Sequence, residues 1–304
     1  MHKKILVALD GSQPSEQILP YARHLAKRLN IPVALLQVIE PEALIPLVAG
    51  KPERYPEVLA AQRGTIGAYL NRVATSFPNS RSVDCLVEVG KPAEIIADKA
   101  AAETGTLIAM TTHGRSGIQR WLLGSVAEKV LHAASNHLLL VRAKETGSPE
   151  ETLWKSILVP LDGSELAESV IPDVIELAKK MGVEIILARA FRFPLNDYGE
   201  GYGSDEGVWD MVRDDARNYL EEKVKQLQSK GAERVTSLLL EGYAAGSIID
   251  LAQKTPESLI AMCTHGRSGV GRWVLGSVTD RVVRHSGDPV LVIRAPGAKV
   301  GGGR

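Results

Sequence analysis

The sequence predicts an α/β fold of two tandem doubly wound domains, each a five-stranded parallel sheet between helices. Two observations carry this prediction. Short apolar strand segments alternate with segments of helical periodicity, and the whole series occurs twice. THGRSGIQRWLLGSV at residues 112–126 returns as THGRSGVGRWVLGSV at 264–278, an offset of 264 − 112 = 152 that also carries Asp10 onto Asp162. Matching register at both ends of a long unit indicates a duplicated domain.

The elements of the first copy follow from its hydrophobic pattern. Short apolar runs with branched side chains predict strands buried on both faces, and the first run ends at Asp10-Gly11. Apolar residues spaced as one helical face predict helices, and Asn30 and Pro32 end the first. We expect strands at Ile5–Leu9, Val33–Ile39, Val83–Val89, Leu107–Met110 and Leu138–Val141, and helices at Ser15–Leu29, Glu57–Thr75 and, opened by Pro92, Ala93–Glu103.

The segment that follows the second strand is rich in proline. Proline cannot propagate a helix or join a central strand. The segment is therefore predicted to be a loop, and its prolines are Pro41, Pro46, Pro52 and Pro56.

The second copy repeats this order and fixes the expected domain boundaries. Its strands are expected at Ile157–Leu161, Glu184–Ala190, Val235–Leu240, Leu259–Met262 and Val290–Ile293. The polar stretch KETGSPEET between the copies is typical of a linker, and the glycine-rich end of the chain is typical of a disordered tail. We expect domains at 1–144 and 153–296, a linker at 145–152 and a tail at 297–304.

Composition excludes several classes of protein. The 304 residues include 36 Lys plus Arg and 36 Asp plus Glu, a balance that argues against a general nucleic-acid binder. The two cysteines, Cys85 and Cys263, lie in no CxxC or Cys/His array, so a disulfide framework and a structural zinc site are not expected. No apolar run reaches the ~20 residues that cross a bilayer. We expect a soluble, cytoplasmic protein that binds neither nucleic acid nor membrane.

Three segments point to a ligand site in each copy. In a doubly wound sheet, ligands bind beyond the carboxyl ends of the strands, where the winding reverses. Asp10 leaves the first strand there, and the segment His113-Gly114-Arg115-Ser116-Gly117 leaves the fourth. A helix start near Gly124-Ser125-Val126 would present free N–H groups and a positive dipole end. The combination favours a bound phosphate.

Each of these residues also has a purely structural interpretation. Ser125 and Ser277 are good helix N-caps, and Asp10 and Asp162 suit Asx turns before a helix. His113 and His265 have no carboxylate or cysteine nearby in sequence, which favours a turn or ligand contact over catalysis. Two interpretations apply to Arg115 and Arg267: contact with a phosphate, or a solvated position in a loop.

At these residues the chain resembles the universal stress protein family, as a tandem member with two copies. The resemblance implies a parallel sheet of order 3-2-1-4-5 in each domain. Nucleotide-binding members carry Gly, two residues, Gly, nine residues, then Gly-Ser or Gly-Thr; Gly114 with Gly124-Ser125 fits, as does Gly266 with Gly276-Ser277. The first glycine is replaced by Thr111 and by Cys263, side chains that would crowd a ribose or phosphate and lower affinity.

The resemblance also implies which residues contact an adenine nucleotide. In the first copy these are Asp10, Val38, Thr111, His113, Gly114, Arg115, Gly124, Ser125 and Val126; in the second they are Asp162, Ala190, Cys263, His265, Gly266, Arg267, Gly276, Ser277 and Val278. ATP is the expected ligand, and Mg²⁺ would arrive with its phosphates, because the sequence shows no dedicated carboxylate cluster.

These expectations favour an ATP-binding stress-response module that acts without turnover. The sequence contains no GxxxxGK[ST] phosphate loop. One alternative is a slow ATPase or phosphotransferase that uses Asp10 or Asp162; another is a dimerisation scaffold without nucleotide affinity. The fifth strands are apolar edges that family members pair, so a homodimer or an intramolecular pseudo-dimer is expected, with an unidentified protein partner.

Overall fold

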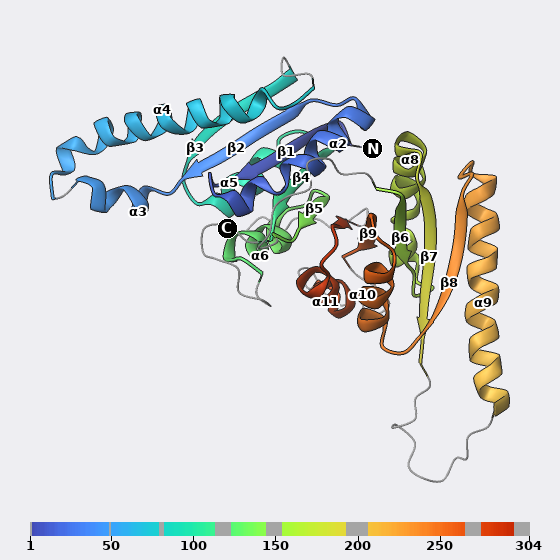
Figure 1. Cartoon of the computed structure of the whole chain (residues 1–304). Helices are drawn as coiled ribbons and strands as arrows, with labels where there is room; N and C mark the ends of the chain where they lie inside the picture. The colour runs from blue at the N-terminus through green and yellow to red at the C-terminus, as the bar shows by residue number, and fades with distance from the viewer. Residues whose placement is uncertain are drawn as a thin grey trace, which may run out of the picture. The chain divides into compact units, whose positions relative to one another are not determined.

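The computed structural model describes residues 2–48, 50–78, 82–112, 123–143, 154–192, 206–264 and 275–294. These residues divide into two compact units, one on each side of the Leu153–Trp154 junction, and each unit is an α/β structure (Figure 1). The proposed linker at 145–152 and tail at 297–304 lie outside the described residues.

The described part of the first unit forms a parallel sheet in the order β3-β2-β1-β4-β5. Its strands are β1 (Lys4–Leu9), β2 (Val33–Ile39), β3 (Val83–Val89), β4 (Thr106–Thr111) and β5 (Leu138–Val141). Because β1 lies between β2 and β4, the winding reverses there. The predicted strand order is confirmed, and so is the position of the switch point.

The described part of the second unit repeats this sheet in the order β8-β7-β6-β9-β10. Its strands are β6 (Ser156–Pro160), β7 (Glu184–Phe191), β8 (Val235–Glu241), β9 (Ser258–Cys263) and β10 (Val290–Ile293), again all parallel. Taken in chain order, this is the same 3-2-1-4-5 arrangement. The predicted fold class is therefore confirmed in both units.

Helices cover the sheets of both units. In the first, the described helices are α1 (Gln13–Glu16), α2 (Leu19–Leu29), α3 (Pro41–Leu44), α4 (Tyr55–Ala74), α5 (Pro92–Ala101) and α6 (Ser125–Ala133), with 3₁₀ turns η1 (Ile45–Val48) and η2 (Pro52–Arg54). In the second they are α7 (Glu165–Glu168), α8 (Ile171–Met181), α9 (Glu206–Ser229), α10 (Ala244–Lys254) and α11 (Ser277–His285). Helix α4 packs on β2 and β3, and α9 packs on β7 and β8.

The core of each unit follows from the apolar strands. Every residue of β4 and of β9 is buried, as the continuous hydrophobic runs predict for central strands covered on both faces. The side strands β3 and β8 are only partly buried. The core therefore lies around β1 and β4 in the first unit and around β6 and β9 in the second, next to the switch points.

The helix predicted at Ser15–Leu29 is wrong in one respect, because the chain forms two helices there. α1 ends at Glu16, and α2 begins at Leu19 with Pro20 in its first turn. A proline ring clashes with the carbonyl four residues earlier and donates no hydrogen bond, so a continuous helix cannot pass through Pro20. At the other end, Asn30 adopts the left-handed conformation (φ 53°) that terminates α2, as predicted.

The predicted proline-rich loop is also wrong. Three of its prolines occupy the first turns of helices: Pro41 in α3, Pro52 in η2 and Pro56 in α4. The N–H groups of a first turn have no intrahelical acceptor, so proline loses nothing there and its fixed φ suits the helix. Three of the four prolines in this segment thus mark helix starts.

Other global features can be stated for the described residues. Among them, no helix is both long and apolar enough to cross a bilayer. Cys85 and Cys263 are free thiols, and Cys263 is buried. Within the same ranges, no three His, Cys, Asp or Glu side chains come close enough together to hold a metal ion.

Candidate functional site

An aspartate follows the first strand of each unit and holds an Asx turn. The Asp10 Oδ1 accepts hydrogen bonds from the Ser12 N–H at 2.9 Å and the Ser12 hydroxyl at 2.5 Å. In the second unit, the Asp162 Oδ1 accepts from the Ser164 N–H at 2.9 Å and the hydroxyl at 2.6 Å. The Asx-turn interpretation of both aspartates is therefore correct, and each turn positions its carboxylate at the carboxyl end of the sheet.

The serine of each Asx turn caps the following helix. The Ser12 Oγ accepts from the Ser15 N–H at 3.3 Å, and the Ser164 Oγ accepts from the Ala167 N–H at 3.1 Å. The residue between the aspartate and the serine is a glycine with positive φ, 79° at Gly11. A side chain there would be strained, which explains the Asp-Gly-Ser sequence in both copies.

A backbone hydrogen bond joins the end of β4 to the start of α6. The Gly124 N–H donates to the Thr112 carbonyl at 2.7 Å, and the Gly276 N–H donates to the Thr264 carbonyl at 2.6 Å. Residues 113–122 and 265–274 between these anchors lie outside the described residues. With them lie six predicted contact residues, namely His113, Gly114, Arg115, His265, Gly266 and Arg267.

The N-cap interpretation of Ser125 and Ser277 is wrong. The N-cap positions of α6 and α11 are Gly124 and Gly276, and neither helix has a side-chain cap hydrogen bond. The first helical bond of α6 runs from the Glu128 N–H to the Gly124 carbonyl, at 2.9 Å. The first-turn N–H groups therefore have no intrahelical acceptor, and the Ser125 hydroxyl is not used to cap them.

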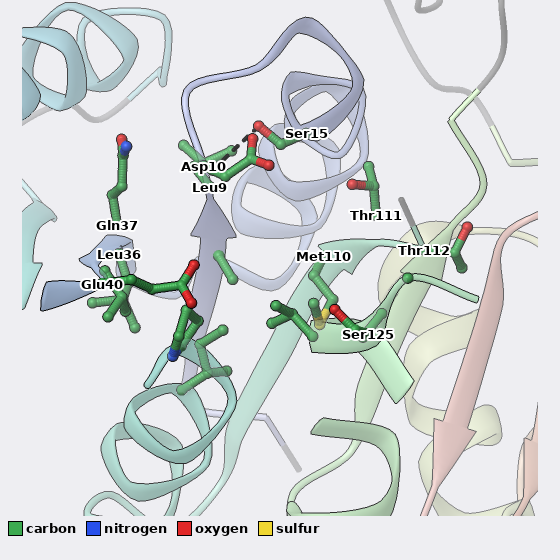
Figure 2. Close-up of a pocket in the computed structure, with 17 residues that line it drawn as sticks. Leu9, Asp10, Ser15, Leu36, Gln37, Glu40, Met110, Thr111, Thr112 and Ser125 are labelled. Carbon is green, nitrogen blue, oxygen red and sulfur yellow. Dashed lines mark hydrogen bonds between the residues drawn. The ribbon is translucent and has the colours of Figure 1, made fainter. Parts of the chain in front are cut away.

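These segments surround a cavity of about 250 Å³ in the first unit. Figure 2 shows it at the carboxyl ends of β1, β2 and β4. We call it pocket 1; its walls are Ala8, Leu9, Asp10, Ser15, Leu36, Gln37, Val38, Glu40, Pro92, Ile96, Met110, Thr111, Thr112, Gly124, Ser125, Val126 and Ala127. All six described contact residues predicted for this copy lie in that wall. The structure thus brings together residues up to 119 positions apart, from Ala8 to Ala127, since 127 − 8 = 119.

A cavity of about 270 Å³ occupies the equivalent place in the second unit. This pocket 2 is lined by Pro160, Leu161, Asp162, Ala167, Ala188, Ala190, Ala244, Ile248, Met262, Cys263, Gly276, Ser277, Val278 and Thr279. The six described contact residues predicted for this copy all belong to its wall. The Thr279 hydroxyl donates to the Cys263 carbonyl at 2.8 Å and thereby ties α11 to the end of β9.

Two side chains stand where the motif of nucleotide-binding proteins has its first glycine. Thr111 is 5% exposed and Cys263 is 4% exposed, and both line their pockets. The Cys263 Sγ also lies 3.5 Å from the Ser169 hydroxyl. Both residues that replace the glycine are therefore part of the cavity walls, and their effect on affinity stays a prediction.

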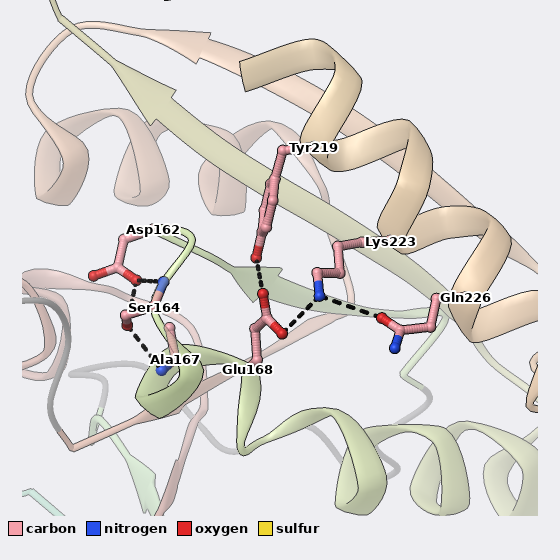
Figure 3. A network of polar contacts seen from close by, with 7 residues as sticks. All are labelled: Asp162, Ser164, Ala167, Glu168, Tyr219, Lys223 and Gln226. Carbon is pink, nitrogen blue, oxygen red and sulfur yellow. Dashed lines mark hydrogen bonds and ion pairs between the residues drawn. The ribbon is translucent and has the colours of Figure 1, made fainter. Parts of the chain in front are cut away.

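Sequence reasoning missed a polar network behind pocket 2 (Figure 3). Glu168, at the end of α7, accepts a 2.7 Å hydrogen bond from the Tyr219 hydroxyl and pairs with the Lys223 ammonium at 2.6 Å. Burial, reinforced by the Glu168 carboxylate, raises the pKa of Tyr219. Burial and Glu16 likewise raise the pKa of Tyr69. The signal was present in the repeat, since both tyrosines precede a buried leucine, Leu70 or Leu220.

Comparison with known proteins matches the duplicated architecture. The sequence profile described as the Universal stress protein family matches residues 1–142 and again residues 153–294. The chain belongs to the universal stress protein family. The two matches place it among the tandem universal stress proteins, with one family domain in each half of the chain.

Individual universal stress proteins support this assignment. One from Methanocaldococcus jannaschii is 31% identical over 150 residues, which cover 48% of this chain and 85% of that protein. One from Mycolicibacterium smegmatis is 24% identical over 295 residues, which cover 95% of this chain and 96% of that protein. The crystal structure of a universal stress protein from Archaeoglobus fulgidus has a TM-score of 0.69 at 22% identity, covering 96% of this chain and 98% of that one, and shares the fold.

Proposed function

We propose that this universal stress protein binds an adenine nucleotide, ATP in the first instance, in the pocket of one or both units. The observation that carries the proposal is the repeated wall: an aspartate after the first strand, the end of the fourth strand and the first turn of the next helix line one cavity in each unit. Such a set at a switch point is suited to a nucleotide.

The described residues fit the parts of a nucleotide. The free N–H groups at the starts of α6 and α11 suit phosphate oxygens, and the helix dipole favours negative charge there. Apolar side chains such as Leu36, Ile96 and Met110 line pocket 1 and offer apolar contact to a purine. Val38 and Ala190 would lie beside the base, and Asp10 and Asp162 beside the ribose.

The proposed activity is binding and signalling through a protein partner, and not turnover. The sequence lacks the phosphate loop of nucleotide hydrolases. Mg²⁺ would enter with the phosphates and neutralise part of their charge. His113, Arg115 and their equivalents in the second copy complete the proposed contact set.

Two measurements test the proposal. The chain is purified without added ligand and denatured, and any released small molecule is identified by mass spectrometry. ATP with Mg²⁺ is then titrated by calorimetry into the wild-type chain and into Val126→Trp and Val278→Trp, which put an indole into one pocket each. Lys129→Trp, on the exposed face of α6, is the matched control.

We expect each pocket variant to lose one binding site and the control to retain both. If no nucleotide is carried and no heat is released up to millimolar ATP, the proposal is wrong. Conversion of bound ATP to ADP that is lost in Asp10→Ala would favour the ATPase alternative.

We further propose that the protein works in the cytoplasm and that the fifth strands, β5 and β10, mediate its assembly, either within one chain or between two. Sedimentation velocity at several concentrations distinguishes a monomer from a dimer. A dimer that disappears in Leu140→Lys, whose folding is checked by circular dichroism, would support pairing through β5.

A further inference from the structure

The two pockets differ most in charge, at the second strand of each unit. The offset of 152 aligns Gln37 and Glu40 of the first unit with Arg189 and Arg192 of the second, since 189 − 37 and 192 − 40 both equal 152. A neutral amide and a carboxylate are thus replaced by two guanidinium groups. Gln37 and Glu40 line pocket 1, whereas Arg189 and Arg192 lie outside the lining of pocket 2, and each pocket contains its own aspartate, Asp10 or Asp162.

Pocket 1 presents hydrogen-bond acceptors to its ligand. Glu40 lines the cavity, and Figure 2 shows its carboxylate turned inward, toward the side of Met110. Gln37 also lines it and is 4% exposed, and its Oε1 has no hydrogen-bond partner within the described ranges. Figure 2 shows the Gln37 amide directed away from Glu40 and Met110, so the carboxylates of Asp10 and Glu40 are the acceptors offered to a ligand; they suit one that brings N–H and O–H donors and repel one that brings extra negative charge.

Pocket 2 has fixed cations beside it. The Arg192 guanidinium lies 4.5 Å from the centre of the Tyr243 ring, and Tyr243 is the N-cap residue of α10, whose first residue Ala244 lines the cavity. Arg189 lies between two wall residues on β7 and is held 4.5 Å over the Tyr219 ring. Stacking on the Tyr243 ring restrains the Arg192 guanidinium, whose planar N–H edge can still donate to an anion, whereas Arg189 makes further interactions of its own.

The glutamate behind each pocket, Glu16 or Glu168, also differs in its neighbouring positive charge. Glu168 is paired with Lys223, whereas the position of Lys223 in the first unit belongs to the buried Val73, because 223 − 73 equals the offset of 219 − 69 = 150 that aligns the two tyrosines. Glu16 therefore has no lysine at the equivalent place.

Other charged residues at equivalent positions oppose this difference. Lys91, the equivalent of Tyr243, is ion-paired with Glu94 at 3.1 Å. Glu165 and Glu241 add exposed carboxylates to the second unit at the positions of Gln13 and Val89. Water and salt screen exposed charges, and Arg192 and Glu40 are exposed like Glu165 and Glu241, so the difference between the pockets should weaken as salt is added.

We infer that the two pockets select ligands of different charge. Pocket 2 is the site for polyphosphate-bearing nucleotides, and pocket 1 prefers adenine ligands of lower charge, such as adenosine or its monophosphate, with Arg192 and Glu40 as the residues that determine this specificity. The inference rests on the proposed nucleotide binding and extends it, because it assigns different ligand classes to two sites of common origin.

The test measures, at each pocket separately, how affinity changes along a series of adenine ligands with zero to three phosphates. Val126→Trp leaves pocket 2 accessible and Val278→Trp leaves pocket 1 accessible, and each variant is titrated with adenosine, AMP, ADP and ATP at several salt concentrations. From adenosine to ATP, we expect affinity at pocket 2 to rise at least about tenfold more than at pocket 1, with a steeper loss in salt.

Charge exchange tests the two named residues. Arg192→Glu is expected to remove most of the gain from phosphates at pocket 2, and Glu40→Arg to create such a gain at pocket 1. Glu53→Arg and Lys254→Glu, exposed residues outside both walls, are the matched controls and should change the series far less.

The outcomes separate this inference from the proposed function. Equal phosphate series at the two pockets, or a stronger gain at pocket 1, overturn the inference and leave nucleotide binding intact. The absence of binding by all four ligands at both pockets overturns the proposed function itself.

Discussion

The Tyr219 hydroxyl donates a 2.7 Å hydrogen bond to the Glu168 carboxylate, which connects α9 to the short helix that follows Asp162. A second contact, between Glu168 and Lys223, adds an ion pair whose side chains are 24% and 16% exposed. The wall of pocket 2 is therefore supported from behind by α9, a helix far from it in sequence.

The two half-buried tyrosines, Tyr69 and Tyr219, predict a loss of stability at alkaline pH. Burial raises the pKa of Tyr69 and of Tyr219, so above pH ~10 the unfolded chain releases protons that the folded chain retains. The free energy of unfolding should fall as pH rises above ~10, by at most about 1.4 kcal/mol per pH unit for each tyrosine. Urea unfolding from pH 8 to 11 measures it. An unchanged alkaline slope in Tyr69→Phe/Tyr219→Phe would contradict this origin.

Replacing the serine of the Asx turn should destabilise its unit. Ser164→Ala removes the hydroxyl that caps α7 and contacts Asp162, and we expect a cost of about 1 kcal/mol. Chemical denaturation followed by circular dichroism measures the change. Ser229→Ala, which removes a hydroxyl bonded only within the end of α9, should cost less than about 0.5 kcal/mol. Equal losses of unfolding free energy in Ser164→Ala and Ser229→Ala would show that the Asx turn adds no stability of its own.

A variant of Ser125, the first residue of α6, distinguishes a structural role of this hydroxyl from a role in ligand binding. The Ser125 hydroxyl does not cap its helix, so Ser125→Ala should change the free energy of unfolding by less than about 0.5 kcal/mol. If the hydroxyl contacts a phosphate, the same variant should weaken ATP binding about tenfold at pocket 1. Calorimetric titration measures the second effect, and Ser277→Ala is its equivalent in pocket 2. A stable variant with unchanged affinity would exclude the phosphate contact.

The residues at the missing glycine positions should limit affinity. Cys263→Gly enlarges pocket 2, and we expect ATP to bind several-fold more tightly, although glycine in a strand costs about 1 kcal/mol. Ala261→Gly is the matched control, because it weakens the same buried strand at a residue that lines no part of the pocket. Thr111→Gly and Ala109→Gly form the equivalent pair for pocket 1. Weaker ATP binding in both Cys263→Gly and Thr111→Gly would show that these side chains contact the ligand favourably.

Much of the fold could be predicted from sequence because it depends on local patterns. The strands β2, β3 and β5 begin and end where the hydrophobic runs do, at Val33–Ile39, Val83–Val89 and Leu138–Val141. The duplication reinforced each assignment, since two copies of one pattern had to agree. The described residues of the predicted contact sets also line their pockets, because motif positions at strand ends converge in any doubly wound sheet.

The errors arose where one residue type supports opposite structures. Proline breaks a helix from within but begins one, and only the chain geometry shows that Pro20 and Pro41 are in first turns. Ser125 follows a glycine that takes the cap position, a shift of one residue that no propensity resolves. The Glu168–Tyr219 contact joins elements 51 residues apart, so it depended on tertiary packing.

The 2.7 Å bond between the Gly124 N–H and the Thr112 carbonyl has a practical consequence. The bond joins the two residues that lie on either side of residues 113–122 in the first unit, and Gly276 and Thr264 are joined in the same way in the second unit. Each stretch can therefore be exchanged between the two units. Replacing residues 113–122 with the sequence of 265–274 would show which ligand preferences depend on the exchanged sequence and which depend on the surrounding pocket wall.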